Sequence, residues 1–373
     1  MLGLYNKHLH LHLHLHFQLT FTVGRIETIQ QLSDLAKKLT NRSFGHVVMV
    51  EGEVGVGKTH ILRRVHEQQQ AKISFLWSTG DSIQSGRRPF HLWKHIFTTL
   101  FFYLKSKTLE EYKSSSVGAD EGIGDSSEEQ MLTAKLGGGV KGDSGTINSS
   151  AQNPMMTATA TTTTAAATAA AAAAAAQEQA NKIRDYEVWI TKFVHKRQPS
   201  LVHYLSCLNE LMDTSFAQTR RTSNKLFKTF STQDKLEKIC EFSFLFMQEY
   251  MKFEGKPLIL ILDGCQFLSS NDWNLTQTFA SYIKNKDQSV KNVACWISTR
   301  PLKNKKYGPK CNLPVPQGYF KRCEEIAHTT ITLEPWNLHH TNEMLTMRFD
   351  GAAVDPELVN LVHERAGGIP LFW

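Results

Sequence analysis

The sequence contains no Cys-X-X-Cys pair, no apolar run long enough to cross a bilayer, and no N-terminal apolar segment followed by a small-residue cleavage site. These absences argue against a zinc-ribbon pattern, a membrane span and a secretory signal. Each of the six cysteines stands alone, and two of them lie inside strongly apolar, strand-like runs. We therefore expect reduced, buried thiols in a cytoplasmic protein rather than a disulfide framework.

A strong excess of one charge is also missing. The 373 residues include 42 Lys and Arg against 35 Asp and Glu, which gives a net charge of +7. This modest basic excess suits a polyphosphate ligand and does not require nucleic acid. Short basic runs at 192–197, 220–228 and 303–310 are interpreted as solvated loops and helix faces.

Two segments have compositions that do not predict a packed core. In residues 1–22, histidine alternates with leucine, so an extended chain would place the imidazoles on one face, where zinc or nickel could bind. Because no ligands of mixed type surround them, we interpret this segment as a low-complexity extension. Residues 113–180 are rich in Gly, Ser, Thr and Ala, which bury too little apolar surface to offset chain entropy. We predict a disordered insert in a surface loop there.

The remaining sequence alternates between strand-like and helical patterns. Short apolar runs predict strands at 46–51, 72–80, 257–264, 292–300 and 329–336. Amphipathic or apolar-rich stretches predict helices at 23–39, 60–70, 88–105, 186–196, 235–253, 271–285 and from Leu338 onward. This alternation indicates an α/β fold, a P-loop NTPase with a parallel sheet flanked by helices. We divide it into a first core part at 23–112, a second at 181–336, and the start of a C-terminal helical lid at 337–373.

A glycine-rich loop carries the clearest functional signal. Residues 52–59, GEVGVGKT, match the phosphate-loop pattern GxxxxGK[ST] in full and lie between a predicted strand and a predicted helix. The backbone N–H groups of such a loop point inward at phosphate oxygens. Lys58 would reach the β- and γ-phosphates, and the Thr59 hydroxyl would complete a Mg²⁺ shell. The residues predicted to bind ATP are Gly52, Glu53, Val54, Gly55, Val56, Gly57, Lys58 and Thr59.

A carboxylate must lie beside the Mg²⁺ ion, at the tip of a neighbouring strand. Asp263 ends the run LILILD and is the candidate, with Thr59, for the metal site. ATPases of this type usually carry a second acid at the next position, where it polarises the attacking water, but here that position is Gly264. The pattern therefore predicts ATP binding with weak hydrolysis at best. Asp272 could substitute as the acid, although a helix N-cap is the simpler prediction for it.

The run 292–300 ends in Thr299 and Arg300. At the tip of an adjacent strand these side chains could contact the γ-phosphate or the attacking water, or could simply pair with a nearby carboxylate. Arg300 therefore joins Asp263 as a candidate catalytic residue.

Five motifs occur in an order that resembles a known family. They are VGR, GEVGVGKT, ILDGCQFLSSNDW, STR and GGIPLF. Their order is similar to that of AAA+-related signal-transduction ATPases of the origin-recognition-like type. ILDGCQFLSSNDW and GGIPLF are most similar to the ATPase region of soluble (type 10) adenylyl cyclases. The resemblance covers 23–112 and 183–373.

The resemblance implies roles for residues at both ends of the matched region. Val23, Gly24 and Arg25 are expected near the adenine pocket. Gly368, Ile369 and Pro370 are expected in the helical lid, with the proline near the nucleotide. A helix C-cap followed by a stop would also explain the GGIP sequence.

These features favour an ATP-binding regulatory module, switched by ATP and ADP and acting on a protein partner or further domains, without a cyclase catalytic domain in this chain. One alternative is an origin-recognition-like ATPase that uses the basic runs on nucleic acid, which is disfavoured because no winged-helix element is visible. Another is a non-hydrolysing scaffold, favoured by Gly264. A GTPase is disfavoured because IKNKDQS differs from the guanine-reading NKxD by one residue in spacing.

Overall fold

The computed structural model describes residues 23–42, 45–80, 89–117, 177–178, 181, 184–216, 230–285, 291–300 and 325–370. The N-terminal extension and nearly all of the predicted insert lie outside these residues, as do two of the three basic runs. The chain divides into two compact units, one made of Met1–Lys105 with Thr191–Trp373 and the other of Ser106–Ile190.

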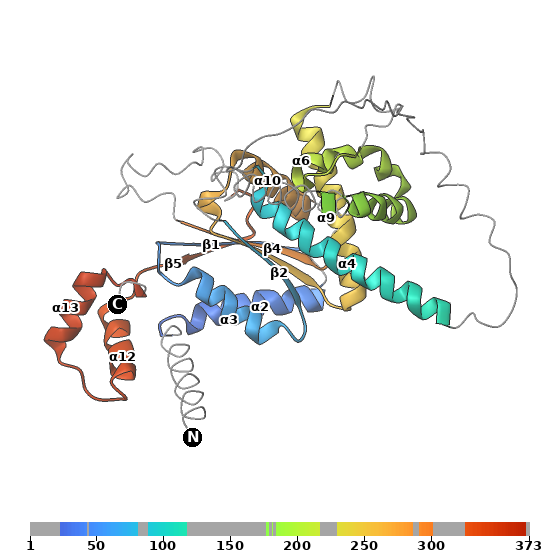
Figure 1. Cartoon of the computed structure of the whole chain (residues 1–373). Helices are drawn as coiled ribbons and strands as arrows, with labels where there is room; N and C mark the ends of the chain where they lie inside the picture. The colour runs from blue at the N-terminus through green and yellow to red at the C-terminus, as the bar shows by residue number, and fades with distance from the viewer. Residues whose placement is uncertain are drawn as a thin grey trace, which may run out of the picture. The chain divides into compact units, whose positions relative to one another are not determined.

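The first unit contains a parallel sheet (Figure 1) with the strand order β2-β3-β4-β1-β5. Its strands are β1 (Val47–Gly52), β2 (Ser74–Thr79), β3 (Leu258–Asp263), β4 (Val293–Thr299) and β5 (Thr329–Leu333). This confirms all the predicted strands and the predicted α/β class. Because every pair is parallel, the carboxyl ends of the strands lie along one edge of the sheet. β4 lies between β1 and β3, so the strand that carries Asp263 is not the direct neighbour of the strand that leads into the glycine-rich loop.

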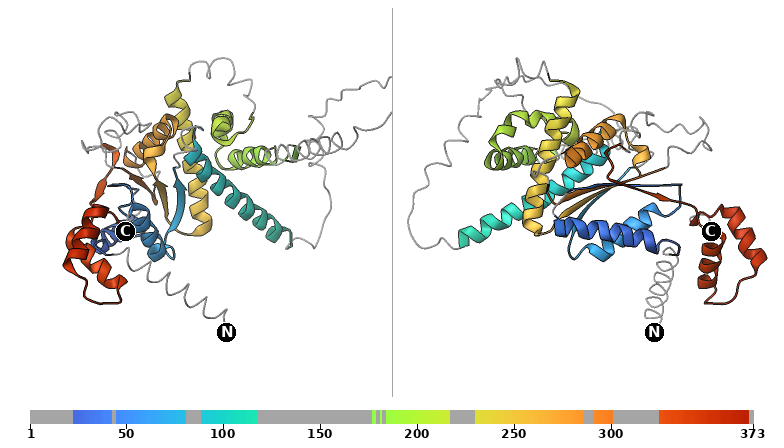
Figure 2. Two further views of the ribbon diagram at one scale, coloured as in Figure 1. Left: turned by 60° about the vertical axis from the view of Figure 1, so that its left-hand side comes forward. Right: turned by 180° about the vertical axis from the view of Figure 1, so that it is seen from behind.

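Helices occupy both faces of this sheet (Figure 2). The helices of the described residues are α2 Ile26–Arg42, α3 Lys58–Gln69, α4 His91–Val117, α6 Asn209–Met212, α9 Thr232–Glu254, α10 Ser270–Asn285, α12 Leu338–Arg348 and α13 Pro356–Ala366, with the 3₁₀ helices η1 Pro199–Leu208 and η2 Cys265–Phe267. α2 and α3 share one apolar core with alternate residues of the strands. α10 packs against β1, β4 and α9. Residues 47–52, 258–263 and 293–299 are buried along their whole length, as expected of strands covered on both faces.

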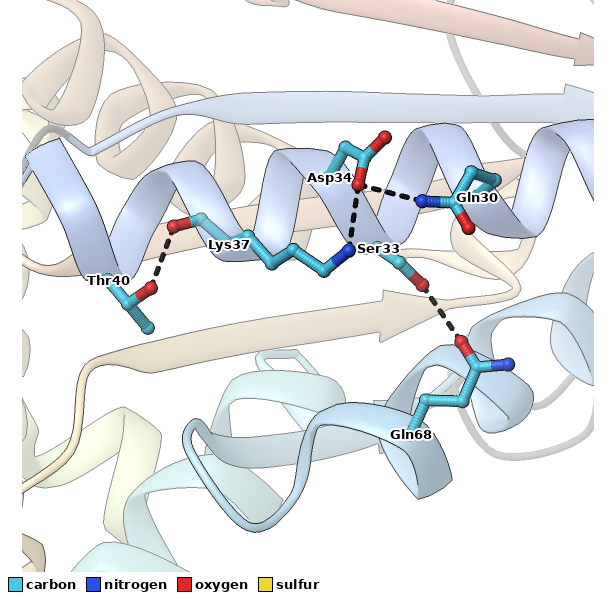
Figure 3. A network of polar contacts seen from close by, with 6 residues as sticks. All are labelled: Gln30, Ser33, Asp34, Lys37, Thr40 and Gln68. Atoms are coloured by element: carbon cyan, nitrogen blue, oxygen red, sulfur yellow. Dashed lines mark hydrogen bonds and ion pairs between the residues drawn. The ribbon is translucent and has the colours of Figure 1, made fainter.

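Polar contacts fix α2 against α3 (Figure 3). The Ser33 hydroxyl on α2 donates to Gln68 Oε1 on α3 at 3.0 Å. On the exposed side of α2, Asp34 accepts from Gln30 at 2.8 Å and from Lys37 at 3.0 Å. The buried apolar face of α2 joins the same core as α3. The two helices therefore form one layer, and the loop at the start of α3 is anchored to it.

On the opposite face, aromatic and capping contacts hold the helices in place. Trp93 of α4 donates its indole N–H to Thr276 of α10 at 3.0 Å. Phe244 of α9 stacks on Phe279 of α10 with ring centroids 4.6 Å apart. A capping box at Ser231 begins α9.

After β5, a short linker leads into α12 and α13, which pack against each other. This confirms the helical segment predicted from Leu338. Asn337 caps the start of α12 and Asp355 caps the start of α13. Gly367 and Gly368 both adopt positive φ, 58° and 69°, and end α13. We refer to α12 and α13 as the C-terminal helix pair.

The second unit contains the last part of α4 and a helix that includes residues 184–190. Within it, the Trp189 indole donates to Thr108 at 3.2 Å.

No described helix combines the length and apolarity needed to cross a membrane. Within the described ranges, no three His, Cys, Asp or Glu side chains cluster as metal ligands. Four cysteines fall in these ranges, and each is buried and outside any disulfide: Cys207, Cys240, Cys265 and Cys295.

Candidate phosphate-binding site

The glycine-rich loop joins the end of β1 to the start of α3. Gly55 and Gly57 have φ of 79° and 104°, in the left-handed region that residues with a Cβ rarely adopt. Gly52 is needed for another reason, because a Cβ there would lie 2.7 Å from Val56 Cγ1 and 2.9 Å from the Leu333 carbonyl oxygen. The loop thus needs glycine for its curvature and for its close approach to β5.

Lys58 lies inside the loop at the first position of α3. Its ammonium donates to the carbonyl oxygens of Gly52 and Glu53, both at 2.8 Å. Burial lowers the pKa of Lys58 to about 8, Asp263 and Glu53 oppose this shift, and Arg300 adds to it. The loop therefore holds a buried cation whose hydrogen bonds are made to the loop's own backbone.

Asp263 brings the sheet and the loop together. The Thr59 hydroxyl donates to Asp263 Oδ2 at 2.6 Å, although the two residues are 204 positions apart in the sequence. The Ser298 hydroxyl, from β4, donates to the other carboxylate oxygen. The predicted metal pair is therefore in direct contact, and Asp263 is held in place from the strand between β1 and β3.

Ser298 is a site residue that the sequence reasoning missed. Strand side chains alternate between faces, so Ser298 and Thr299 point to opposite sides of β4. Ser298 reaches Asp263, whereas the buried Thr299 hydroxyl has no hydrogen-bond partner among the described residues. The two-residue period of the run VACWIST puts Ser298 and Thr299 on opposite faces, but placing Ser298 beside Asp263 also required the strand order.

Arg300 follows β4 and lies close enough to Lys58 for its charge to lower the lysine pKa. Its guanidinium lies over the Phe267 ring, 5.4 Å from the centroid. The buried Nε has no hydrogen-bond partner within the described ranges. Its place beside the loop agrees with the expected position, and its catalytic role stays a prediction.

A side chain at the residue after Asp263 would be strained. Gly264 has φ of 72°, and a Cβ added to it would lie 3.0 Å from the Gly80 carbonyl oxygen. A Cβ added to Gly80 would lie 2.6 Å from the Gly264 carbonyl oxygen. Gly80 also donates its backbone N–H to the Asp263 carbonyl at 2.7 Å. The ends of β2 and β3 therefore meet backbone to backbone, which explains a glycine at the position of the expected second acid.

Asp272 has a structural role different from the predicted N-cap. Ser269 precedes α10 and accepts from the Asp272 backbone N–H at 3.2 Å, while its hydroxyl donates to the Asp272 carboxylate at 2.6 Å. Ser269 is therefore the cap, and Asp272 is its partner in the first turn. Burial raises the pKa of Asp272, and the Ser269 hydroxyl and the backbone N–H groups of Leu92 and Trp93 oppose this shift. The carboxylate is thus buried between the start of α10 and the start of α4, with one oxygen held by Ser269.

The segment Val23 to Arg25 lies between the loop and the C-terminal helix pair. Val23 is buried in an apolar cluster with residues of that pair, and a Cβ on Gly24 would lie 2.8 Å from the His340 ring. Arg25 donates to the Val56 carbonyl of the loop at 3.3 Å and to the Glu334 carbonyl at 2.5 Å.

Pro370 is buried at the end of this same helix pair. Next to it, the Gly368 carbonyl accepts from the Trp336 backbone N–H at 2.7 Å. Both family-derived segments are therefore placed around the linker after β5, and their contact with adenine stays a prediction.

The residues present fit a magnesium-bound triphosphate. The Thr59 hydroxyl and the Asp263 carboxylate supply the hard oxygen ligands that Mg²⁺ prefers. Lys58 supplies a buried positive charge at the start of a helix, where anions are favoured. The buried Nε groups of Arg25 and Arg300 lack acceptors in the described part of the chain. These unsatisfied donors flank the loop and match a ligand rich in acceptor oxygens.

Comparison with known proteins gives a family match and distant structural matches. The profile described as the AAA ATPase domain matches residues 22–289. No curated protein matches the sequence.

Two solved structures are similar at low identity. One is the ORC2 protein of Aeropyrum pernix in its ADPNP-ADP complexes, with 8% identity and a TM-score of 0.35, covering 91% of this chain and 56% of that one. The other is a Walker-type ATPase of Pyrococcus abyssi, with 10% identity and a TM-score of 0.35, covering 93% of this chain and 64% of that one. The chain spans less than two thirds of either structure.

Proposed function

Because the chain belongs to the AAA ATPase domain family, we propose that it binds ATP and Mg²⁺ at residues 52–59 and uses the bound nucleotide as a regulatory switch. The observation that carries the proposal is the 2.6 Å contact between Thr59 and Asp263. The contact places the hydroxyl of the phosphate-loop threonine beside a carboxylate at the end of β3, which is the pair of oxygen ligands that a magnesium site needs.

The residues of the site would act by binding and orienting the ligand. Lys58 would exchange the two loop carbonyls for phosphate oxygens, because a charged acceptor forms the stronger hydrogen bond. Thr59 and Asp263 would exchange their mutual hydrogen bond for contact with the metal, which neutralises phosphate charge when bound. Ser298 would keep the Asp263 carboxylate oriented throughout.

Slow turnover follows from the same geometry. Gly264 supplies no carboxylate to polarise water, and Asp272 is fully buried at the start of α10, where it pairs with Ser269. Arg300 could stabilise charge that develops at the γ-phosphate, but it cannot accept a proton. The site is therefore better suited to holding ATP for long periods than to rapid cycling, and a non-hydrolysing scaffold is the limiting case.

The regulatory role draws support from the sequence motifs. Their order resembles that of AAA+-related signal-transduction ATPases, and the runs ILDGCQFLSSNDW and GGIPLF resemble the ATPase region of soluble adenylyl cyclases. Both resemblances suit a module that acts on a protein partner or on further domains. ATP and ADP are the proposed ligands in either case.

The magnesium part of the proposal is tested with Asp263→Asn. The variant removes a charged metal ligand while it keeps the size and one oxygen of the side chain. We expect ATP affinity in the presence of Mg²⁺ to fall about 10- to 100-fold, which corresponds to about 1.5–3 kcal/mol for an interaction with a charged group. Affinity measured in EDTA should change much less. Calorimetric titration with and without Mg²⁺ measures both.

The matched control is Asp34→Asn, which removes a half-exposed carboxylate from α2. It should leave both affinities unchanged. An Asp263→Asn variant whose affinity still rises with Mg²⁺ as in the wild type would show that the metal binds elsewhere.

ATP affinity is also expected to depend on pH through Lys58. Without ligand its pKa is about 8, and a bound triphosphate would raise that pKa, so binding takes up a proton. Affinity is then greatest below pH 8 and falls as the pH rises through the free-protein pKa. Between pH 7 and pH 9 we expect about a tenfold loss, since one pKa unit is a factor of ten in the equilibrium.

Lys58→Arg provides the comparison, because a guanidinium stays charged across this range. Calorimetry of both proteins in buffers of different ionisation enthalpy would report the proton uptake. Parallel pH profiles for the two proteins would contradict the assignment of the titrating group to Lys58.

A further inference from the structure

Arg25 makes an unusual pair of contacts for a buried cation. The side chain is 8% exposed, and one nitrogen, Nη2, donates both to Val56 in the phosphate loop and to Glu334 in the linker after β5. These acceptors are 31 and 309 positions away in the sequence. A single guanidinium therefore bridges the loop and the linker that leads to the C-terminal helix pair.

The loop and the linker are also neighbours in the sheet. Gly52 is paired with Leu333, the residue directly before Glu334. The distance from the Gly52 position to the Leu333 carbonyl leaves no space for a Cβ. The start of the loop and the residue before the linker are therefore in direct backbone contact, and Arg25 hydrogen-bonds to Val56 on one side of this contact and to Glu334 on the other.

The C-terminal helix pair is attached to the same linker at its far end. Trp336 donates to the Gly368 carbonyl at 2.7 Å, and a Cβ on Gly368 would overlap the Trp336 carbonyl oxygen. Trp336 belongs to the apolar cluster that contains Met344 and Val359. Val23, two residues before Arg25, belongs to it too. The helix pair thus contacts both the linker and the segment that carries Arg25.

The other end of the bridge is fixed to the phosphate-loop helix. α2 begins directly after Arg25, and Ser33 joins it to α3 through Gln68. Lys58 holds the Gly52 and Glu53 carbonyls, so its transfer to phosphate oxygens would free this part of the loop, while Ser33 keeps α2 joined to α3. The Arg25 bond to Val56 is the longer of the two, 3.3 Å against 2.5 Å, so it is the one expected to change first.

We propose that Arg25 is a positioning residue that transmits the nucleotide state of the phosphate loop to the C-terminal helix pair. The inference rests on the proposed ATP binding and adds the path by which bound ATP is sensed. Loss of the Val56 contact would leave the guanidinium bonded to Glu334 alone. The direction in which the linker leaves β5 would then change. α12 and α13 are therefore the part of the chain whose order depends on the ligand.

Hydrogen–deuterium exchange of residues 338–366 tests this directly. Wild type, Arg25→Met, Arg25→Lys and Lys38→Met would each be measured without nucleotide and with saturating MgATP, after calorimetry has established occupancy. We expect ATP to change exchange at least threefold in the wild type and in Lys38→Met, which loses an exposed cation from α2, the helix that follows Arg25. Arg25→Met should lose this difference at equal occupancy.

Arg25→Lys is the second variant, which keeps the positive charge and so tests the proposal if Arg25→Met does not fold. Its ammonium ends one bond short of Nη2 and cannot reach both carbonyls, so at least half of the ATP-dependent difference should disappear while the charge remains. A wild-type response in whichever Arg25 variant folds would overturn the inference, as would ATP-bound wild type with unchanged exchange. Failure of the wild type to bind ATP in calorimetry would instead remove the proposed function, and the inference with it.

Discussion

Replacing Lys58 with alanine is expected to abolish ATP binding at millimolar nucleotide. Lys58 is the buried cation of the loop, and each charge-assisted hydrogen bond it makes to phosphate contributes about 1.5–3 kcal/mol. Two such bonds correspond to a loss of about 100-fold or more in affinity. The substitution also leaves the Gly52 and Glu53 carbonyls without their present donor, which should loosen the loop.

Arg63→Ala is the matched variant for this experiment. Arg63 is exposed on the same helix, so its removal costs one positive charge without touching the loop. Calorimetry should show wild-type affinity for Arg63→Ala and no measurable binding for Lys58→Ala, with thermal unfolding confirming that both proteins fold. Equal affinities in the two variants would place the nucleotide outside residues 52–59.

Gly264→Glu is expected to destabilise the protein without creating an active ATPase. The substitution restores the acid that such ATPases usually carry, but position 264 has φ of 72° and faces the Gly80 backbone. A left-handed conformation costs a residue with a Cβ about 1–2 kcal/mol, and the contact at 3.0 Å adds to it. We expect a total loss of about 2 kcal/mol or more in the free energy of unfolding.

Gly264→Ala separates backbone strain from chemistry. It adds the same Cβ without a carboxylate, so it should lose nearly as much stability as Gly264→Glu in urea unfolding. Phosphate release should stay slow in both variants. Efficient turnover by Gly264→Glu, at undiminished stability, would mean that the missing acid alone limits hydrolysis and that the contact with Gly80 relaxes easily.

The parts of the fold that the sequence predicted are those governed by local patterns. The runs VVMVEG, LILILD and VACWIST are continuously apolar apart from their ends, and each became a buried parallel strand. The glycine-rich loop was recognisable because its glycines, Lys58 and Thr59 are adjacent in the sequence. A strand precedes the loop and a helix follows it, as the motif requires, so the local conformation of the loop could be predicted from the sequence.

What the sequence did not reveal depends on neighbours distant in the chain. The position of β4 between β1 and β3 is a matter of topology, and it alone explains why Ser298 contacts Asp263. From the sequence, Gly264 was interpreted as the absence of a second acid. Its contact with Gly80 could be predicted only by knowing that β2 pairs with β3. The bridge from Arg25 to Glu334 spans 309 positions and leaves no local pattern.

Asp272 shows how a local pattern can be read incorrectly by a few residues. An aspartate near a helix start predicts an N-cap, but Ser269 also qualifies and lies where the helix begins. The spacing Ser-X-X-Asp was available in the sequence and favours Ser269 as the cap. The contacts with the start of α4 could not have been predicted, because they join segments about 180 residues apart.

A crystal structure of the chain with Mg²⁺ and a non-hydrolysable ATP analogue tests the central claim most directly. The account predicts the triphosphate within the loop, Lys58 Nζ within hydrogen-bond distance of its outer phosphates, and the metal ion beside Thr59 and Asp263. Lys58 should no longer contact the Gly52 and Glu53 carbonyls. A nucleotide bound at another surface, with the Thr59 to Asp263 hydrogen bond intact, would contradict it.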